Sequence, residues 1–215
     1  MRSLDGTQVY LTAHNSNIGD TLLTATNQIV STYGPTTNGF GPYTVNGKNT
    51  LLFTSSSYTC GFQVLSLVTG QVLYTVKFGG SCSWQTNSPS HGVSLSPDEQ
   101  RLYVMDDPLG LLQVYDVSGV PNSAPVFVKS VQLSTITGNE TPCQSWCAKE
   151  GWALADLSGR YVFVADSGDV IDTSTLTVVG HLPALQNTRQ EIEIDWGNGA
   201  VSATSTRFGL GHVTS

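Results

Sequence analysis

The stretch Ser96-Pro97-Asp98-Glu99-Gln100-Arg101-Leu102-Tyr103-Val104 decides the fold of this chain. It joins a turn, rich in residues that tolerate tight-turn dihedrals, to a strand of apolar and aromatic side chains. The same combination occurs around Tyr10, Phe53 and Phe163, so the four aromatic residues stand 43, 50 and 60 positions apart. The turns are assigned to residues 3–6, 45–48, 96–99 and 157–160, and the strands that follow them to 8–11, 51–54, 101–104 and 161–164.

Two further strands complete each repeat. A third is predicted at 63–70, 113–117 and 169–175, and a fourth at 28–32, 72–76, 126–131 and 176–179. Four strands in each such repeat are typical of a β-propeller blade, and no long segment has the apolar spacing of an amphipathic helix. The sequence predicts an all-β fold, a β-propeller of four-stranded antiparallel blades in a single domain of residues 1–215, with blades at 1–38, 39–80, 88–136 and 148–182.

The two ends of this array are irregular. The chain opens directly at the first turn, so the first blade is expected to lack its innermost strand. At the other end Gly197-Asn198-Gly199 marks a C-terminal hairpin within residues 189–212. The hairpin either pairs with the first blade and closes a ring, or extends an open arc.

Composition and charge exclude several classes of protein. Of the 215 residues only 12% are charged, which argues against a coiled coil or a helical bundle. The net charge is −7 and there are only nine Lys and Arg, without a basic run, so neither nucleic acid nor an anionic membrane is an expected partner. No apolar stretch is long enough for a transmembrane helix or a signal peptide, so the chain is expected to be soluble as given.

The repeats resemble the YVTN type of β-propeller, which is often labelled lactonase-like. The most specific stretches are residues 90–98, which hold Ser-Pro-Asp, and Gly168-Asp169-Val170-Ile171-Asp172-Thr173, and the resemblance extends over nearly the whole chain. Members of that family generally have seven blades, so the resemblance implies either a partial member or a small propeller in its own right.

The family topology places on one face the loops that enter each innermost strand and the loops between second and third strands. This face is called the loop-rich face below, and it would carry His14, Cys60, Cys82, Trp84, His91, Asp106, Asp107, Cys143, Trp146, Cys147, Glu150, Asp166 and Asp169. The opposite face would hold mostly turns. Asp106 and Asp166 occupy equivalent positions, where two carboxylates could do acid-base work or bind a cation, or could simply cap loops.

His91 is the candidate catalytic base, with Glu150 or Asp106 as its carboxylate partner. The alternative reading is that His91 orders a loop through a hydrogen bond to a neighbouring backbone. Candidate ligand-binding residues are His14, Trp84, Trp146, Asp166 and Arg189. The two Trp side chains could stack on a flat ligand. Arg189 and Arg207 could clamp a carboxylate, or pair on the surface with Glu191 and Asp195.

The four cysteines are all expected in loops of the loop-rich face, and an even number there suits disulfides formed in an oxidising compartment. The expected pairs are Cys143 with Cys147 and Cys60 with Cys82, in a secreted or periplasmic protein. The Cys143 to Cys147 spacing is a weak zinc signal, so no metal site is predicted. The sequence also lacks a phosphate-binding loop, a serine nucleophile elbow and a zincin motif.

Two functions of different classes remain. The first is a propeller that binds a small-molecule, carbohydrate-like or protein ligand through its loop-rich face. The second is a lactonase-like hydrolase or polysaccharide lyase that uses His91 and a carboxylate, because propellers host binding and catalysis alike. No cofactor is required, although a divalent cation would suit the carboxylates. An incomplete ring could also associate with itself.

Overall fold

The computed structural model describes residues 3, 5–13, 15–37, 39–56, 59–79, 89–106, 109–135, 151–188 and 191–206, with backbone alone at 89–91 and 205–206. Within these ranges the regular structure consists of β-strands and one short 3-10 helix, η1 (Pro183–Leu185). No helix in the described ranges has the length and hydropathy of a bilayer span. The predicted all-β fold class is confirmed.

The strands form antiparallel sheets in chain order, with three full sheets of four strands. The first sheet has only three strands, β1 (Gln8–Leu11), β2 (Gly19–Leu23) and β3 (Ile29–Tyr33). The second contains β4 (Tyr43–Val45), β5 (Leu51–Ser56), β6 (Gly61–Ser66) and β7 (Val72–Lys77). The third contains β8 (Pro89–Leu95), β9 (Arg101–Asp106), β10 (Leu111–Asp116) and β11 (Val126–Gln132). The fourth contains β12 (Trp152–Ala155), β13 (Tyr161–Ala165), β14 (Asp169–Asp172) and β15 (Thr177–His181).

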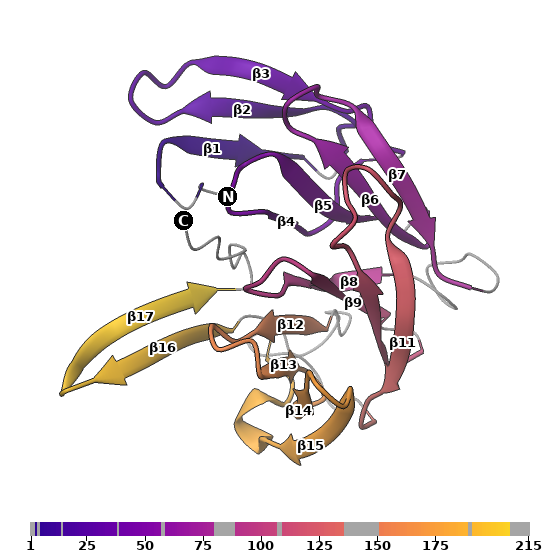
Figure 1. The fold of residues 1–215 in the computed structure, drawn as a ribbon, viewed down its shortest axis with the longest axis vertical. Helices are drawn as coiled ribbons and strands as arrows, with labels where there is room; N and C mark the ends of the chain where they lie inside the picture. Colours follow the sequence, from indigo (N-terminus) through magenta and orange to yellow (C-terminus); the bar gives the residue numbers. More distant parts are fainter. Residues whose placement is uncertain are drawn as a thin grey trace.

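The sheets follow one another in an arc (Figure 1), with β4, β8 and β12 on the inner side and β3, β7, β11 and β15 on the outer side. This is the arrangement of propeller blades. The three-stranded first sheet agrees with the expected absence of its innermost strand. The hairpin β16 (Ile192–Gly197) and β17 (Ala200–Thr206) forms a separate two-stranded sheet that projects from the arc and does not pair with β1.

The cores lie between successive sheets. One apolar cluster joins the first and second sheets, one joins the second and third, and one joins the third and fourth. The strands β5 and β9 each contribute to two clusters, because alternate side chains of a strand point to opposite faces. In β9, Leu102 and Val104 pack toward the second sheet while Tyr103 and Met105 pack toward the fourth. Burial on both faces explains why these strands read as nearly continuous apolar runs.

One turn geometry precedes every second strand. Its fourth residue has a positive φ, at Gly6 (73°), Asn49 (58°), Glu99 (60°) and Gly159 (72°). The N–H of that residue donates to the carbonyl of the first residue, as in Glu99 to Ser96 at 2.9 Å. The turns therefore span 3–6, 46–49, 96–99 and 156–159. The sequence assignment was right for the first and third and off by one residue for the second and fourth.

The opening side chain of each turn also caps the strand that follows. The N–H of the strand residue five positions on donates to Ser3 Oγ, Asn46 Oδ1, Ser96 Oγ and Asp156 Oδ1, each at 2.9 Å. Three residue types thus satisfy the same backbone donor. We refer to the surface formed by these turns as the turn face.

Candidate functional site

Most of the candidate site residues lie outside the described residues. These are His14, Cys82, Trp84, Asp107, Cys143, Trp146, Cys147, Glu150, Arg189 and Arg207. The backbone of His91 lies in β8, but its side chain is not described. The proposed pairing of His91 with Glu150 or Asp106 therefore stays a prediction. Cys60 is disulfide-bonded, and its predicted pairing with Cys82 stays a prediction.

Asp106 is fully buried at the end of β9, on the edge predicted for the loop-rich face. Its Oδ2 accepts a hydrogen bond from Gln113 Nε2 at 3.3 Å. Gln113 Oε1 in turn accepts from Ser130 Oγ at 2.7 Å. The carboxylate thus anchors a row of polar side chains that runs across β9, β10 and β11.

Asp169 is also fully buried, and its carboxylate contacts residues from two other segments. Its two carboxylate oxygens accept from the backbone N–H and the hydroxyl of Ser134, each at 2.7 Å. Its Oδ1 lies 3.3 Å from Nδ1 of His181, which is 39% exposed. An Asp–His pair suggests catalysis when it is considered alone.

The repeat shows that Asp169 has a structural role. Asp169 pairs with His181 in the sheet register, Gln63 pairs with Thr75, and Gln113 pairs with Ser130. The side chains of all three pairs contact each other, with 2.8 Å between Gln63 Nε2 and Thr75 Oγ1. One polar link between third and fourth strands is therefore repeated in all three full sheets.

The same third-strand residue also fastens its sheet to the preceding one. Thr37 N, which follows β3, donates to Gln63 Oε1 at 2.8 Å, and Ser134 N, which follows β11, donates to Asp169 Oδ2 at 2.7 Å. We call this contact the sheet-to-sheet latch. The sequence contained a signal for it, because Gln63, Gln113 and Asp169 each precede Val in the predicted third strands. Asp169 was assigned only to a functional face, and the two glutamines were not identified.

Asp166 follows β13 and is 1% exposed, with a left-handed φ of 64°. Its Oδ2 accepts from Gly151 N at 2.8 Å. A second carboxyl group lies near it, because the charge of Asp166 contributes to raising the pKa of Glu191, after burial as the main cause. Both carboxyl oxygens of Glu191 are shielded from solvent. The expectation that Glu191 is available for pairing on the surface is therefore wrong.

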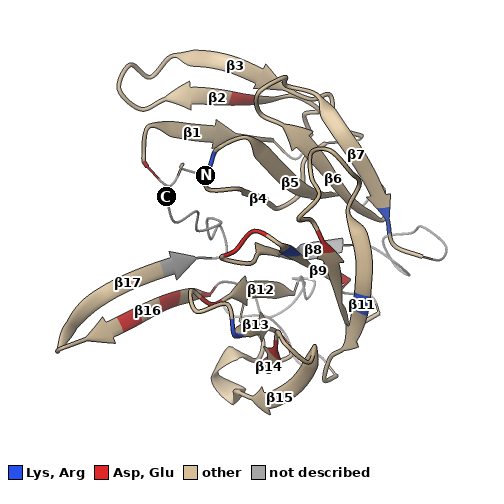
Figure 2. Cartoon of the chain, in the orientation of Figure 1, with Lys and Arg blue, Asp and Glu red and all other residues tan. Residues whose placement is uncertain are grey.

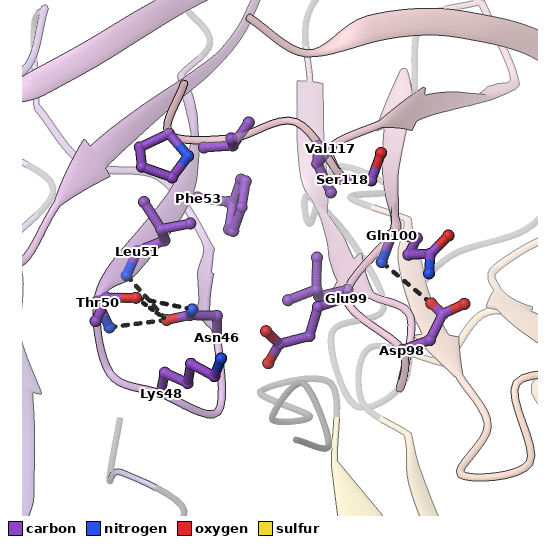
Figure 3. A pocket seen from close by; sticks show the side chains of 13 residues that line it. Asn46, Lys48, Thr50, Leu51, Phe53, Asp98, Glu99, Gln100, Val117 and Ser118 are labelled. Carbon is purple, nitrogen blue, oxygen red and sulfur yellow. Dashed lines mark hydrogen bonds between the residues drawn. The ribbon is translucent and has the colours of Figure 1, made fainter. Parts of the chain in front are cut away.

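An open groove lies on the turn face between the second and third sheets (Figure 3), with a cavity volume of about 400 Å³. Its lining consists of Asn46, Lys48, Thr50, Leu51, Phe53, Leu95, Asp98, Glu99, Gln100, Val117, Ser118, Val120 and Pro121. The second sheet supplies one wall and the third sheet the other. Glu99 reaches across, and its Oε1 accepts from Gly47 N at 2.5 Å.

A second groove occupies the corresponding position between the third and fourth sheets. Its cavity volume is about 310 Å³, and it is lined by Ser96, Pro97, Asp98, Gln100, Arg101, Tyr103, Ser158, Gly159 and Thr173. Asp98 and Gln100 line both grooves. The two grooves are therefore adjacent, with the 96–99 turn between them.

Arg101, which lines the second groove, is already paired with a carboxylate of the protein. Arg101 contacts Asp116 at 2.5 Å, and hydrogen bonds from Ser118 together with Arg101 lower the pKa of Asp116 to about 2. Burial raises the pKa of Tyr103 to about 12, so its phenol stays neutral. By contrast, the Lys48 ammonium and the Gln100 amide make no hydrogen bonds within the described part of the chain. These two side chains are free to meet a ligand.

The described residues do not include a set of three or more His, Cys, Asp or Glu side chains placed to bind a metal. Acidic residues lie on several turns and on β16, and basic residues are sparse (Figure 2).

Comparisons with known proteins support the fold. No protein-family model and no curated protein matches the chain. Among solved structures it is similar to Kuenenia stuttgartiensis hydrazine synthase, with a TM-score of 0.62 and 15% identity over 90% of this chain and 51% of that one. The chain thus spans about half the length of that protein. At this identity the likeness shows the fold alone, which is β-propeller-like.

Proposed function

We propose that this chain is a binding protein, and that the two adjacent grooves on its turn face hold an extended polypeptide segment. The observation that carries the proposal is that the same groove occurs at two successive sheet boundaries, with Gln100 in the lining of both. A ligand that follows both grooves must be extended. The larger groove is within the size range of ligand sites in proteins.

The chemistry of the lining favours a peptide over a carbohydrate. Sugar rings are commonly bound on exposed aromatic faces, but Phe53 and Tyr103 are only 2% and 1% exposed. The grooves offer instead an apolar floor from Leu51, Val117 and Val120, together with the unpaired amide of Gln100 and ammonium of Lys48. Amide groups suit a peptide backbone, and apolar pockets between them suit alternate side chains.

This proposal places the binding surface on the turn face. Binding through the loop-rich face remains a second prediction, since most residues predicted for that face lie outside the described ranges. A YVTN-type family assignment and a secreted or periplasmic location are further parts of the proposal. The disulfide at Cys60 supports an oxidising compartment.

The test is a selection of twelve-residue peptides by phage display, followed by fluorescence polarisation with the selected peptides. Gln100→Trp places an indole in both grooves and should weaken binding at least tenfold. Arg160→Trp is the matched control, because Arg160 holds the equivalent position in the fourth sheet and lines neither groove. Unchanged affinity in Gln100→Trp, or equal loss in both variants, would exclude the grooves as the binding site.

A further inference from the structure

Three Asn-Gly pairs occur in the sequence, at 38–39, 46–47 and 198–199. An asparagine followed by glycine is chemically labile, because the backbone nitrogen of the glycine can attack the side-chain amide carbon without hindrance from a side chain of its own. Asn38 lies outside the described residues. The other two pairs have the same sequence but very different surroundings.

The Asn46-Gly47 pair is held by hydrogen bonds to both of its reacting groups. Asn46 is 5% exposed, and its Oδ1 accepts from Thr50 N at 2.8 Å and from Leu51 N at 2.9 Å. Its Nδ2 donates to Thr50 Oγ1 at 3.0 Å. The Gly47 N–H, which must lose its proton to act as a nucleophile, donates to Glu99 Oε1 at 2.5 Å. Attack on the Asn46 amide would break these bonds, so this pair is protected.

The Asn198-Gly199 pair has none of these contacts. It forms the turn between β16 and β17, and the flanking residues Gly197 and Ala200 pair with each other. The φ angles of Asn198 and Gly199 are 53° and 79°, as in a type I′ hairpin turn. Asn198 is exposed, and within the described part of the chain neither its side chain nor the Gly199 N–H makes a hydrogen bond. Both reacting groups are therefore open to solvent.

The hairpin also allows the turn to change shape, which ring closure between the two residues requires. β16 and β17 form a sheet of their own, and an isolated two-stranded sheet is only marginally stable in water. The turn lies at the tip of the hairpin, away from the arc (Figure 1). The Asn46 turn instead leads into β5, which belongs to a four-stranded sheet and contributes to two apolar clusters. Local opening should therefore be far more frequent at Asn198 than at Asn46.

We propose that Asn198 is a modification site, at which the side-chain amide is converted to a carboxyl group through a cyclic succinimide. The Gly199 nitrogen forms a bond to Asn198 Cγ, the Cγ–Nδ2 bond breaks, and ammonia leaves with the proton of the Gly199 N–H. Water then adds to one of the two ring carbonyls and opens the ring. The products are aspartate and isoaspartate at position 198, and solvent water is the only co-reactant.

Both products change the hairpin. Aspartate adds a negative charge to a chain whose net charge is already −7. Isoaspartate adds one carbon to the backbone of a two-residue turn, so the turn geometry that sets the register of β16 and β17 is lost. Isoaspartate should therefore loosen the hairpin more than aspartate does.

The experiment incubates the full chain at mildly alkaline pH and follows the two described Asn-Gly pairs by peptide mapping with mass spectrometry. In the folded chain, conversion at Asn198 should be at least tenfold faster than at Asn46. In urea, where the contacts of Asn46 are lost, the two rates should be similar. Reaction in isotope-labelled water should place the heavy oxygen in the product at position 198. Equal rates in the folded chain, or conversion of Asn198 only in urea, would overturn the proposal.

Two variants test the mechanism. Asn198→Gln keeps an amide but requires a larger ring, so ammonia loss at this position should fall at least tenfold. Glu99→Ala removes the acceptor of the Gly47 N–H and should accelerate conversion at Asn46 while the rate at Asn198 stays unchanged. Ammonia loss at the wild-type rate in Asn198→Gln would refute the cyclic route, and an unchanged Asn46 rate in folded Glu99→Ala would refute the protection by Glu99. Asn198 lines neither groove, so these results do not depend on peptide binding.

Discussion

The backbone N–H of Leu157 donates to Glu193 Oε2 at 2.8 Å, which fastens the hairpin to the turn of the fourth sheet. The same turn position in the second sheet is Gly47, whose N–H is satisfied by Glu99 of the third sheet. In the third sheet that position is Pro97, which has no N–H to satisfy. Each of these turn amides is therefore either capped by a carboxylate from the next element or absent.

Replacement of Glu193 by Ala should loosen the hairpin without unfolding the sheets. The Leu157 amide loses a charge-assisted hydrogen bond, which is stronger than a neutral one. Hydrogen exchange should become at least severalfold faster in β16 and β17 and stay unchanged in β9. The control is Asp195→Ala, which should leave exchange in the hairpin near that of the wild type.

The interface between the second and third sheets should be sensitive to cavities. Leu102 is fully buried, so Leu102→Ala should lower the free energy of unfolding by about 2–5 kcal/mol. Leu11 is 43% exposed, and Leu11→Ala should cost less than about 1 kcal/mol. Urea denaturation measures both, and equal losses would contradict the assigned core.

Substitutions at Asp169 should distinguish a structural role in the sheet-to-sheet latch from a catalytic role of its carboxylate. Asp169→Asn keeps an acceptor for Ser134 N and adds an amide donor, as Gln63 does in the second sheet, so the change in the free energy of unfolding should stay below about 1 kcal/mol. Asp169→Ala leaves the Ser134 N–H unpaired and should cost about 1–3 kcal/mol. A large loss of stability in the Asn variant would show that the charge itself is required.

Acid should weaken the contact between Asp116 and Ser118. Hydrogen bonds from Ser118 and the Arg101 guanidinium lower the pKa of Asp116 to about 2, from 3.8. Because the folded value is lower than the unfolded one, the stabilisation is present above about pH 4 and is lost as pH falls toward 2. Asp116→Asn should flatten the pH dependence of stability in this window relative to the wild type, and the effect should be small because the group is exposed. If Asp116→Asn changed the pH dependence of stability only above pH 5, the stabilisation would belong to another titratable residue.

The sequence predicted the second strands well because their signal is local. Apolar runs such as Leu102–Val104 follow closely after turns, and these strands begin at the predicted residues. The positions of two turns were predicted one residue off. Asn46 and Asp156 open those turns and cap the following strand, where serine opens the other two. The recurrence of Gln63, Gln113 and Asp169 could have indicated the latch. The donors to Gln63 and Asp169 come from segments 26 and 35 residues away, which spacing alone does not reveal.

The burial of Glu191 could not be predicted, since it depends on where the 185–187 segment lies against Asp166. A glutamate two residues after an arginine is expected from the sequence to lie on the surface. The grooves were missed for a related reason. They arise between turns of successive sheets, and the sequence indicated only that those turns share a face.

Each apolar cluster within the described chain draws on two successive sheets, so the array is held together by nearest-neighbour interfaces. Cohesion of this kind behaves as a one-dimensional chain of coupled units, in which opening at one boundary need not propagate to the next. Within the described chain the second and third sheets each share apolar clusters with two other sheets. Thermal fluctuations should therefore open one boundary between sheets at a time, without requiring the whole array to unfold.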